Sequence, residues 1–111
     1  MTLALVLAAC GSPPPPVPEG PCADAYAGIV ASLEDMFRRS GTPQPIWPDE
    51  AEYVQRCEAL SLDEKQLHCL DPAASSADPA GCRDALRPVQ ADVDRLAKWF
   101  GDHTTRAGGE R

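Results

Sequence analysis

Basic side chains are scarce in this chain. Lys and Arg together number 10 against 17 Asp and Glu, so the formal net charge of the 111 residues is −7. Phosphate backbones and anionic lipid headgroups attract the opposite charge, so this balance argues against a nucleic-acid partner. The length allows one domain, because a second hydrophobic core does not fit into so short a chain.

The sequence also lacks the motifs of the common catalytic and cofactor sites. It has no Cys-x-x-Cys pair, no glycine-rich phosphate loop, no Ser-x-x-Lys or Gly-x-Ser-x-Gly motif and no calcium loop of alternating oxygen ligands. The cysteines lie too far apart in the chain for the short ligand spacing of zinc sites. We therefore predict no cofactor, no metal site and no catalytic residue, and an enzyme is the less favoured class.

Long hydrophobic runs are absent as well. The apolar run Leu3–Ala9 is far shorter than the ~20 residues that a membrane-spanning helix needs, and it has the length of a signal-peptide core. It leads into Leu7-Ala8-Ala9-Cys10, which resembles the lipobox of bacterial lipoproteins: a Leu, two small residues and a Cys. No Lys or Arg precedes the run, whereas signal peptides usually begin with basic residues.

The resemblance to a lipobox implies how this end of the chain is processed. Residues 1–9 are then a cleaved signal peptide, and Cys10 carries a diacylglycerol on its thiol and an acyl chain such as palmitate on its new amino group. Because Gly11 rather than Asp follows Cys10, the resemblance also implies sorting to the periplasmic face of the outer membrane.

A proline-rich tether is predicted to follow, so that residues 10–21 comprise the lipidated Cys10 and this tether. Proline lacks an N–H and fixes φ, so the segment cannot form a helix or a sheet. At about 3.1 Å per residue in polyproline II, Ser12–Pro21 spans roughly 30 Å and acts as a spacer. A ligand for a proline-recognition domain is the less favoured interpretation, because no basic residue flanks the run.

Residues 22–100 are predicted to form a helical domain. A first helix ends near Arg39, because Ser40-Gly41 and Pro43 are stop signals. A second helix starts at the capping residue Asp49. Apolar residues at helical spacing give the first helix the inner face Cys22, Tyr26, Ile29, Val30, Leu33, Met36 and Phe37 and the second helix the inner face Tyr53, Val54, Cys57 and Leu60.

Shorter helices are predicted beyond Leu60. Ser61 and Glu64 have the spacing of a capping box, which starts a third helix that runs through Leu67 and Leu70 and ends at Asp71-Pro72. Residues 73–77 are predicted to be a link, and Asp78-Pro79 starts a fourth helix that Pro88 kinks or interrupts. The last inner face is expected to be Val89, Val93, Leu96, Ala97 and Phe100, and residues 101–111 a flexible tail.

Trp47 lies in the proline-bearing loop between the first two helices. The favoured interpretation is a ring that folds back as a lid over a small core. The alternative is an exposed aromatic side chain that contacts a partner, which makes Trp47 the candidate contact residue of the domain.

The cysteines predict covalent cross-links. With Cys10 lipidated, the four others, Cys22, Cys57, Cys69 and Cys82, form an even set in an exported chain and predict two disulfides. If the first two helices form an antiparallel hairpin, Cys22 lies near Cys57, and Cys69 and Cys82 flank the next link. This pairing is favoured, with Cys22–Cys82 and Cys57–Cys69 as the alternative.

The cysteine frame also resembles a family. Tyr53-Val54-x-x-Cys57, Cys69-Leu70 and an Asp78 ahead of Cys82 are similar to small cysteine-rich lipoproteins of unknown function in myxobacteria. The resemblance implies an exported, lipid-anchored, all-α domain held by disulfides, and it supplies no activity. This agrees with the small bundle of about four helices and two disulfides that the helical spacing and the cysteines predict.

Two function classes follow from the sequence. The favoured one is a non-enzymatic binding or structural module of the cell envelope, attached to the membrane by its lipid, with an unknown protein or cell-wall partner. The alternative is an envelope thiol or redox factor that uses Cys69 with His68, which requires Cys69 to be free or its bridge to be labile.

Overall fold

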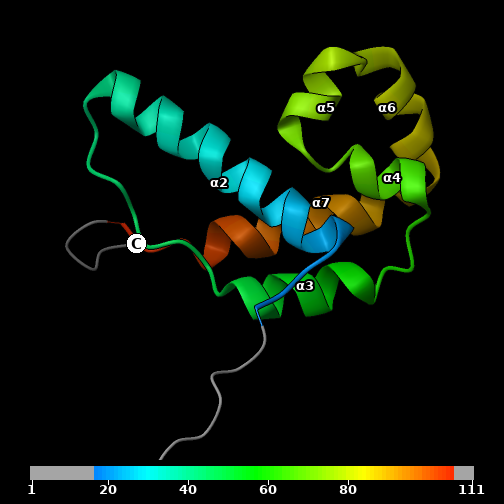
Figure 1. Cartoon of the computed structure of the whole chain (residues 1–111), viewed down its shortest axis with the longest axis horizontal. Helices are drawn as coiled ribbons and strands as arrows, with labels where there is room; N and C mark the ends of the chain where they lie inside the picture. The colour runs from blue at the N-terminus through cyan, green and yellow to red at the C-terminus, as the bar shows by residue number, and fades with distance from the viewer. Residues whose placement is uncertain (1–16, 107–111) are drawn as a thin grey trace, which may run out of the picture.

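The computed structural model of the chain describes residues 17–106 (Figure 1). The predicted signal peptide, Cys10 and most of the predicted proline-rich tether lie outside these residues, as does the end of the predicted tail. The described residues form the helices α2 (Pro21–Ser40), α3 (Glu50–Glu58), α4 (Glu64–His68), α5 (Pro72–Ala77), α6 (Pro79–Leu86), the 3-10 helix η1 (Arg87–Val89) and α7 (Gln90–Asp102). Within this range the predicted all-α, disulfide-linked fold is confirmed.

The main core lies between α2, α3 and α7. Its buried residues are Cys22, Ala23 and Ala25 of α2, Tyr53, Val54 and Cys57 of α3, and Leu96, Trp99 and Phe100 of α7. The rings of Tyr26, Tyr53 and Phe100 lie together at its centre, with centroids 5.6 to 6.0 Å apart. Helices α4, α5 and α6 curl into a second group beside α2 (Figure 1).

Both predicted inner faces of the long helices need a correction. Met36 is 49% exposed, because Phe37 is the residue that turns toward the Trp47 ring. In α7, Ala97 is exposed and Trp99, which the sequence analysis did not select, is buried. Trp99 and Leu96 are three residues apart and share one face of the helix, so the buried stripe of α7 is rotated from the predicted one.

The N-cap of the third helix lies two residues later in the chain than expected. Asp63, not Ser61, is the N-cap: its carboxylate accepts from Gln66 N at 2.8 Å, and the Gln66 side chain accepts from Asp63 N at 3.0 Å. Ser61 has a φ of 53°, whereas an N-cap needs an extended backbone. Because the turn after α3 gives Ser61 a positive φ, the capping box forms between Asp63 and Gln66 rather than between Ser61 and Glu64.

The predicted link at residues 73–77 is helical. Asp71 caps α5 by accepting from Ala73 N at 3.0 Å, and Pro72 occupies its first turn. An Asp-Pro pair therefore starts α5, although the same pattern was expected to start a helix at Asp78-Pro79 alone. The start at Asp78-Pro79 is confirmed for α6. Pro88 interrupts the next helix as predicted, with η1 between α6 and α7.

The segment predicted as a tail begins with regular structure. Helix α7 continues to Asp102, and Thr105 exchanges backbone hydrogen bonds with Ile46 at 2.8 and 2.9 Å. The tail prediction is therefore wrong for residues 101–106, because this pairing is a long-range contact that local composition does not report.

The two disulfides join Cys22 to Cys57 and Cys69 to Cys82, with Cα atoms 5.9 and 5.3 Å apart. The favoured pairing is confirmed. The first bridge links the start of α2 to the last turn of α3, and the second links the end of α4 to α6 across α5.

Removing the two bridges should have unequal effects. They close loops with sequence separations of 35 and 13 residues. Loop-closure entropy then predicts that Cys22→Ala with Cys57→Ala lowers the free energy of unfolding by about 4 kcal/mol, and Cys69→Ala with Cys82→Ala by about 3 kcal/mol. Urea unfolding followed by circular dichroism measures both losses. A larger loss for the second pair would contradict this account.

Two helical glycines form a matched test of packing. A Cβ on Gly28 of α2 would collide with the Asp71 carboxylate that caps α5, whereas a Cβ on Gly101 of α7 meets open space. Gly101→Ala should raise the free energy of unfolding by about 0.5–1 kcal/mol. Gly28→Ala should be at least about 1 kcal/mol less stable than Gly101→Ala. The new Cβ displaces the Asp71 carboxylate from its cap on α5, and this loss offsets the gain in helix propensity.

The Gly28 result can be assigned to its cause with a second substitution. If Asp71 is responsible, Gly28→Ala should cost no stability when it is made in an Asp71→Ala background. A cost that persists there would mean that the collision with the cap is not its source.

Candidate binding site

A largely apolar pocket lies beside Trp47, where the end of α2, the loop at 41–48 and the end of α7 meet. Its volume is about 630 Å³, within the range of small-molecule and peptide-anchor pockets. We call it the Trp47 pocket, and its lining residues are Leu33, Phe37, Thr42, Pro43, Pro45, Trp47, Phe100, Gly101, Thr104 and Arg106.

Three contacts hold the loop that carries Trp47. The Tyr26 hydroxyl donates to the Pro48 carbonyl at 2.7 Å, the Gln44 side chain donates to the Glu34 carbonyl at 3.0 Å, and Ile46 pairs with Thr105. Pro45 and Pro48 are buried. Because proline also fixes φ at three positions of this loop, the indole is presented from a restrained segment.

The Trp47 ring packs on the core and also borders the pocket. It meets Phe37 edge-on with centroids 6.0 Å apart and lies 6.4 Å from the Phe100 ring. The side chain is half-buried. The ring therefore packs over the core as the favoured interpretation expects, whereas contact of Trp47 with a partner stays a prediction.

Among residues 17–106, one charged side chain lines this pocket. That side chain is Arg106, and no Asp or Glu of these residues lines it. Within residues 17–106, Arg106 has no ion-pair partner, whereas six other basic side chains form ion pairs. Arg106 thus offers the pocket a cationic group that no described carboxylate pairs with, in a chain whose formal net charge is −7.

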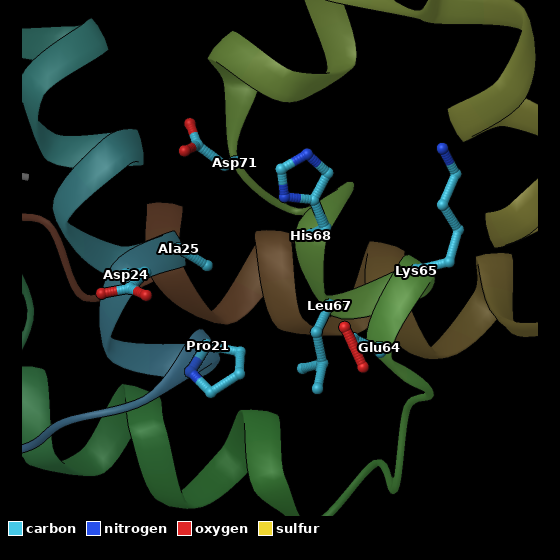
Figure 2. Close-up of a pocket in the computed structure, with 8 residues that line it drawn as sticks. All are labelled: Pro21, Asp24, Ala25, Glu64, Lys65, Leu67, His68 and Asp71. Carbon is cyan, nitrogen blue, oxygen red and sulfur yellow. The ribbon is translucent and has the colours of Figure 1, made fainter.

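A second, more polar groove of about 540 Å³ separates the start of α2 from α4 (Figure 2). It is lined by Pro21, Asp24, Ala25, Glu64, Lys65, Leu67, His68 and Asp71. Figure 2 shows the His68 ring near Asp71, while Lys65 extends away from both. Lys65 pairs with Asp78 at 3.4 Å. Among the described residues no set of three His, Cys, Asp or Glu side chains is placed to hold a metal ion.

The structure separates the roles of His68 and Cys69. His68 is exposed at this groove, whereas Cys69 is buried and bonded to Cys82. A thiol nucleophile must be free to ionise, and the sulfur of Cys69 is not a thiol in this state. His68 and Cys69 therefore do not form a nucleophile and base pair here.

Burial perturbs the two tyrosines of the core. It raises the pKa of Tyr53 from 10.0 to about 12. The pKa of Tyr26 is also raised, first by burial and then by the carboxylates of Glu50, Asp49 and Glu34. Both hydroxyls thus stay protonated over the physiological range, and Tyr26 keeps the proton that it donates to the Trp47 loop.

The sequence located only part of this site. It selected Trp47, and it assigned Leu33, Phe37 and Phe100 to the core without indicating that they border a pocket. Arg106 and Thr104 were missed because they fall in the predicted tail. Ile46 and the β-branched Thr105 give no signal that they pair, because neither lies in a run of alternating apolar and polar residues that would predict a strand.

Comparison with known proteins adds no assignment. No protein-family model matches the chain, and neither a curated protein nor a solved structure is similar enough to count as a match. No helix of residues 17–106 is long and apolar enough to cross a membrane.

The raised pKa of Tyr53 predicts an alkaline loss of stability. The folded protein keeps the Tyr53 proton at a higher pH than the unfolded chain does, so this stabilisation is complete below about pH 10 and disappears as the pH rises toward about 12. The free energy of unfolding should fall by about 1.4 kcal/mol per pH unit in that window. Urea titrations at several alkaline pH values measure this slope.

The variant Tyr53→Phe is the control, because it keeps the ring and removes the titrating group. Its stability should fall less steeply with pH in the same window. An identical slope in both proteins would show that Tyr53 does not titrate with unfolding.

Proposed function

We propose that the chain is a lipid-anchored protein of the cell envelope, and that its helical domain binds a partner rather than catalysing a reaction. One observation carries the proposal: all four cysteines that follow the proline-rich segment are in disulfides. Disulfides persist in oxidising compartments outside the cytoplasm. Cys10, the remaining cysteine, is the one that the lipobox resemblance marks for acylation.

The anchor and the binding site would lie at opposite ends of α2. The tether enters the helix at Pro21, whereas the Trp47 pocket contacts α2 at Leu33 and Phe37. At about 1.5 Å per residue, Leu33 is roughly 18 Å along the helix from Pro21. A domain anchored through its tether would thus keep this pocket accessible, on the periplasmic face of the outer membrane.

Two acyl chains or more would make the attachment stable. Each buried CH₂ contributes about 0.8 kcal/mol, and one chain alone gives only reversible binding to a bilayer. Acylation of Cys10 on both its thiol and its amino group would provide the two or more chains that stable attachment needs.

Intact mass of the protein from the membrane fraction of its native host tests the proposal, with iodoacetamide added before any reduction. The expected mass is that of residues 10–111 plus acyl chains, with no alkylated thiol. The matched variant Cys10→Ser should carry no acyl chain and should not be extracted with the membrane.

A soluble species that retains residues 1–9 would contradict the lipid anchor. Alkylation of Cys22, Cys57, Cys69 or Cys82 without prior reduction would contradict the oxidised state on which the compartment rests.

A further inference from the structure

We propose that the Trp47 pocket binds the proline-rich segment Ser12–Glu19 of a second copy of this chain. The inference names a partner for the site used in the proposed function and rests on it to that extent. Residues 17–19 of this segment are described by the structure, and residues 12–16 are known from the sequence.

The first argument is the chemistry of the pocket wall. Three rings, Phe37, Trp47 and Phe100, surround it together with Pro43 and Pro45. Aromatic-lined grooves are the recurring acceptors of proline-rich segments, because the pre-formed polyproline II conformation loses little entropy on binding. The carbonyl groups of such a segment have no internal hydrogen bonds and can accept from an indole N–H such as that of Trp47.

The charges of the pocket and of the segment are opposite in sign. A proline run with a basic flank suits an acidic groove, but within residues 17–106 this pocket is lined by Arg106 and by no carboxylate. The proline run of this chain ends in the matching sequence, Val17-Pro18-Glu19. Glu19 is exposed, and neither it nor Arg106 has an ion-pair partner within residues 17–106. The segment therefore offers a carboxylate to the one charged side chain of the pocket.

Exposed apolar side chains also support the proposal. The exposed large hydrophobic side chains of residues 17–106 are Val17 at 75%, Met36 at 49% and Ile46 at 67%. Val17 belongs to the proline-rich segment. Ile46 lies in the loop between the pocket residues Pro45 and Trp47, whereas Met36 points away from Phe37 on α2 and does not line the pocket. Uncovered apolar side chains thus occur on the segment and on the loop that carries Trp47.

Within one copy the matching charges do not meet, because Glu19 and Arg106 form no ion pair in the structure. Glu19 is two residues from Pro21, so it extends only about 7 Å from the start of α2, whereas Leu33, the first pocket residue of α2, is roughly 18 Å along the helix. A neighbouring copy can place its Glu19 against Arg106 without this constraint. Each copy presents one segment and one pocket, so the contact is head-to-tail, and a shared membrane would raise its effective concentration.

A charge-exchange experiment tests this proposal. A synthetic peptide with the sequence of residues 11–20 is titrated onto the full chain in detergent, at a protein concentration where sedimentation shows a monomer, with Trp fluorescence as the readout. The wild-type peptide should bind saturably. Arg106→Glu in the protein or Glu19→Arg in the peptide should each weaken binding about fivefold, and the two changes together should restore it.

The matched control is Arg83→Glu, because Arg83 is also exposed and also without an ion pair among the described residues, but lies on α6 away from the pocket. It should leave the peptide affinity unchanged. At higher concentration the wild-type chain should self-associate, and excess peptide should reverse this association.

Three outcomes would overturn the proposal: no saturable peptide binding, no rescue when both charges are exchanged, or self-association that the peptide does not reverse. The intact mass of the same sample reports the lipid separately. A lipidated protein that does not bind the peptide would therefore refute this inference and leave the envelope anchor in place.

Discussion

The Cys22–Cys57 disulfide is the constraint on which the rest of the fold depends. It joins the first turn of α2 to the last turn of α3, and Cys57 is completely buried at that junction. The bridge fixes the two helices as an antiparallel hairpin, which places Tyr26 beside Tyr53 and creates the surface on which α7 packs. A core with so few large side chains gains little from hydrophobic burial alone, so a covalent restraint on the unfolded chain has a large relative effect.

The second bridge has a more local role. Cys69–Cys82 holds α4 to α6 across the short helix α5, whose six residues are Pro, Ala and Ser and cover little apolar surface. Small side chains allow this group to approach α2 closely, to the point where Gly28 faces the capping carboxylate of Asp71. The packing of this half of the domain thus relies on close backbone approach and capping more than on large apolar side chains.

The Trp47 pocket lies at the end of the core, where the end of α2, the loop at 41–48 and the end of α7 meet and leave a space between them. Phe100 is buried in the core, Trp47 packs against the core, and Phe37 meets the Trp47 ring edge-on. The loop at 41–48 that carries Trp47 is held by its own hydrogen bonds, and the space beside these rings stays open. The walls of this pocket are restrained on two sides, by the prolines of the loop and by the isolated β-bridge. Its single Arg106 distinguishes it from the remaining surface, where most basic side chains are already neutralised by carboxylates.

The sequence by itself determined the helical class, the limits of the longest helix, the Asp49 and Asp78 caps and the break at Pro88, because these depend on apolar periodicity and on backbone chemistry within a few residues. It also favoured the correct cysteine pairing, through the simple topology of a helical hairpin. Tertiary structure decided what local rules leave open. It moved the third cap to Asp63, made residues 72–77 a helix, buried Trp99 in place of Ala97 and paired Thr105 with Ile46. Each of these depends on which surfaces meet, and contacts between residues 59 positions apart in the chain leave no trace in the pattern of either segment.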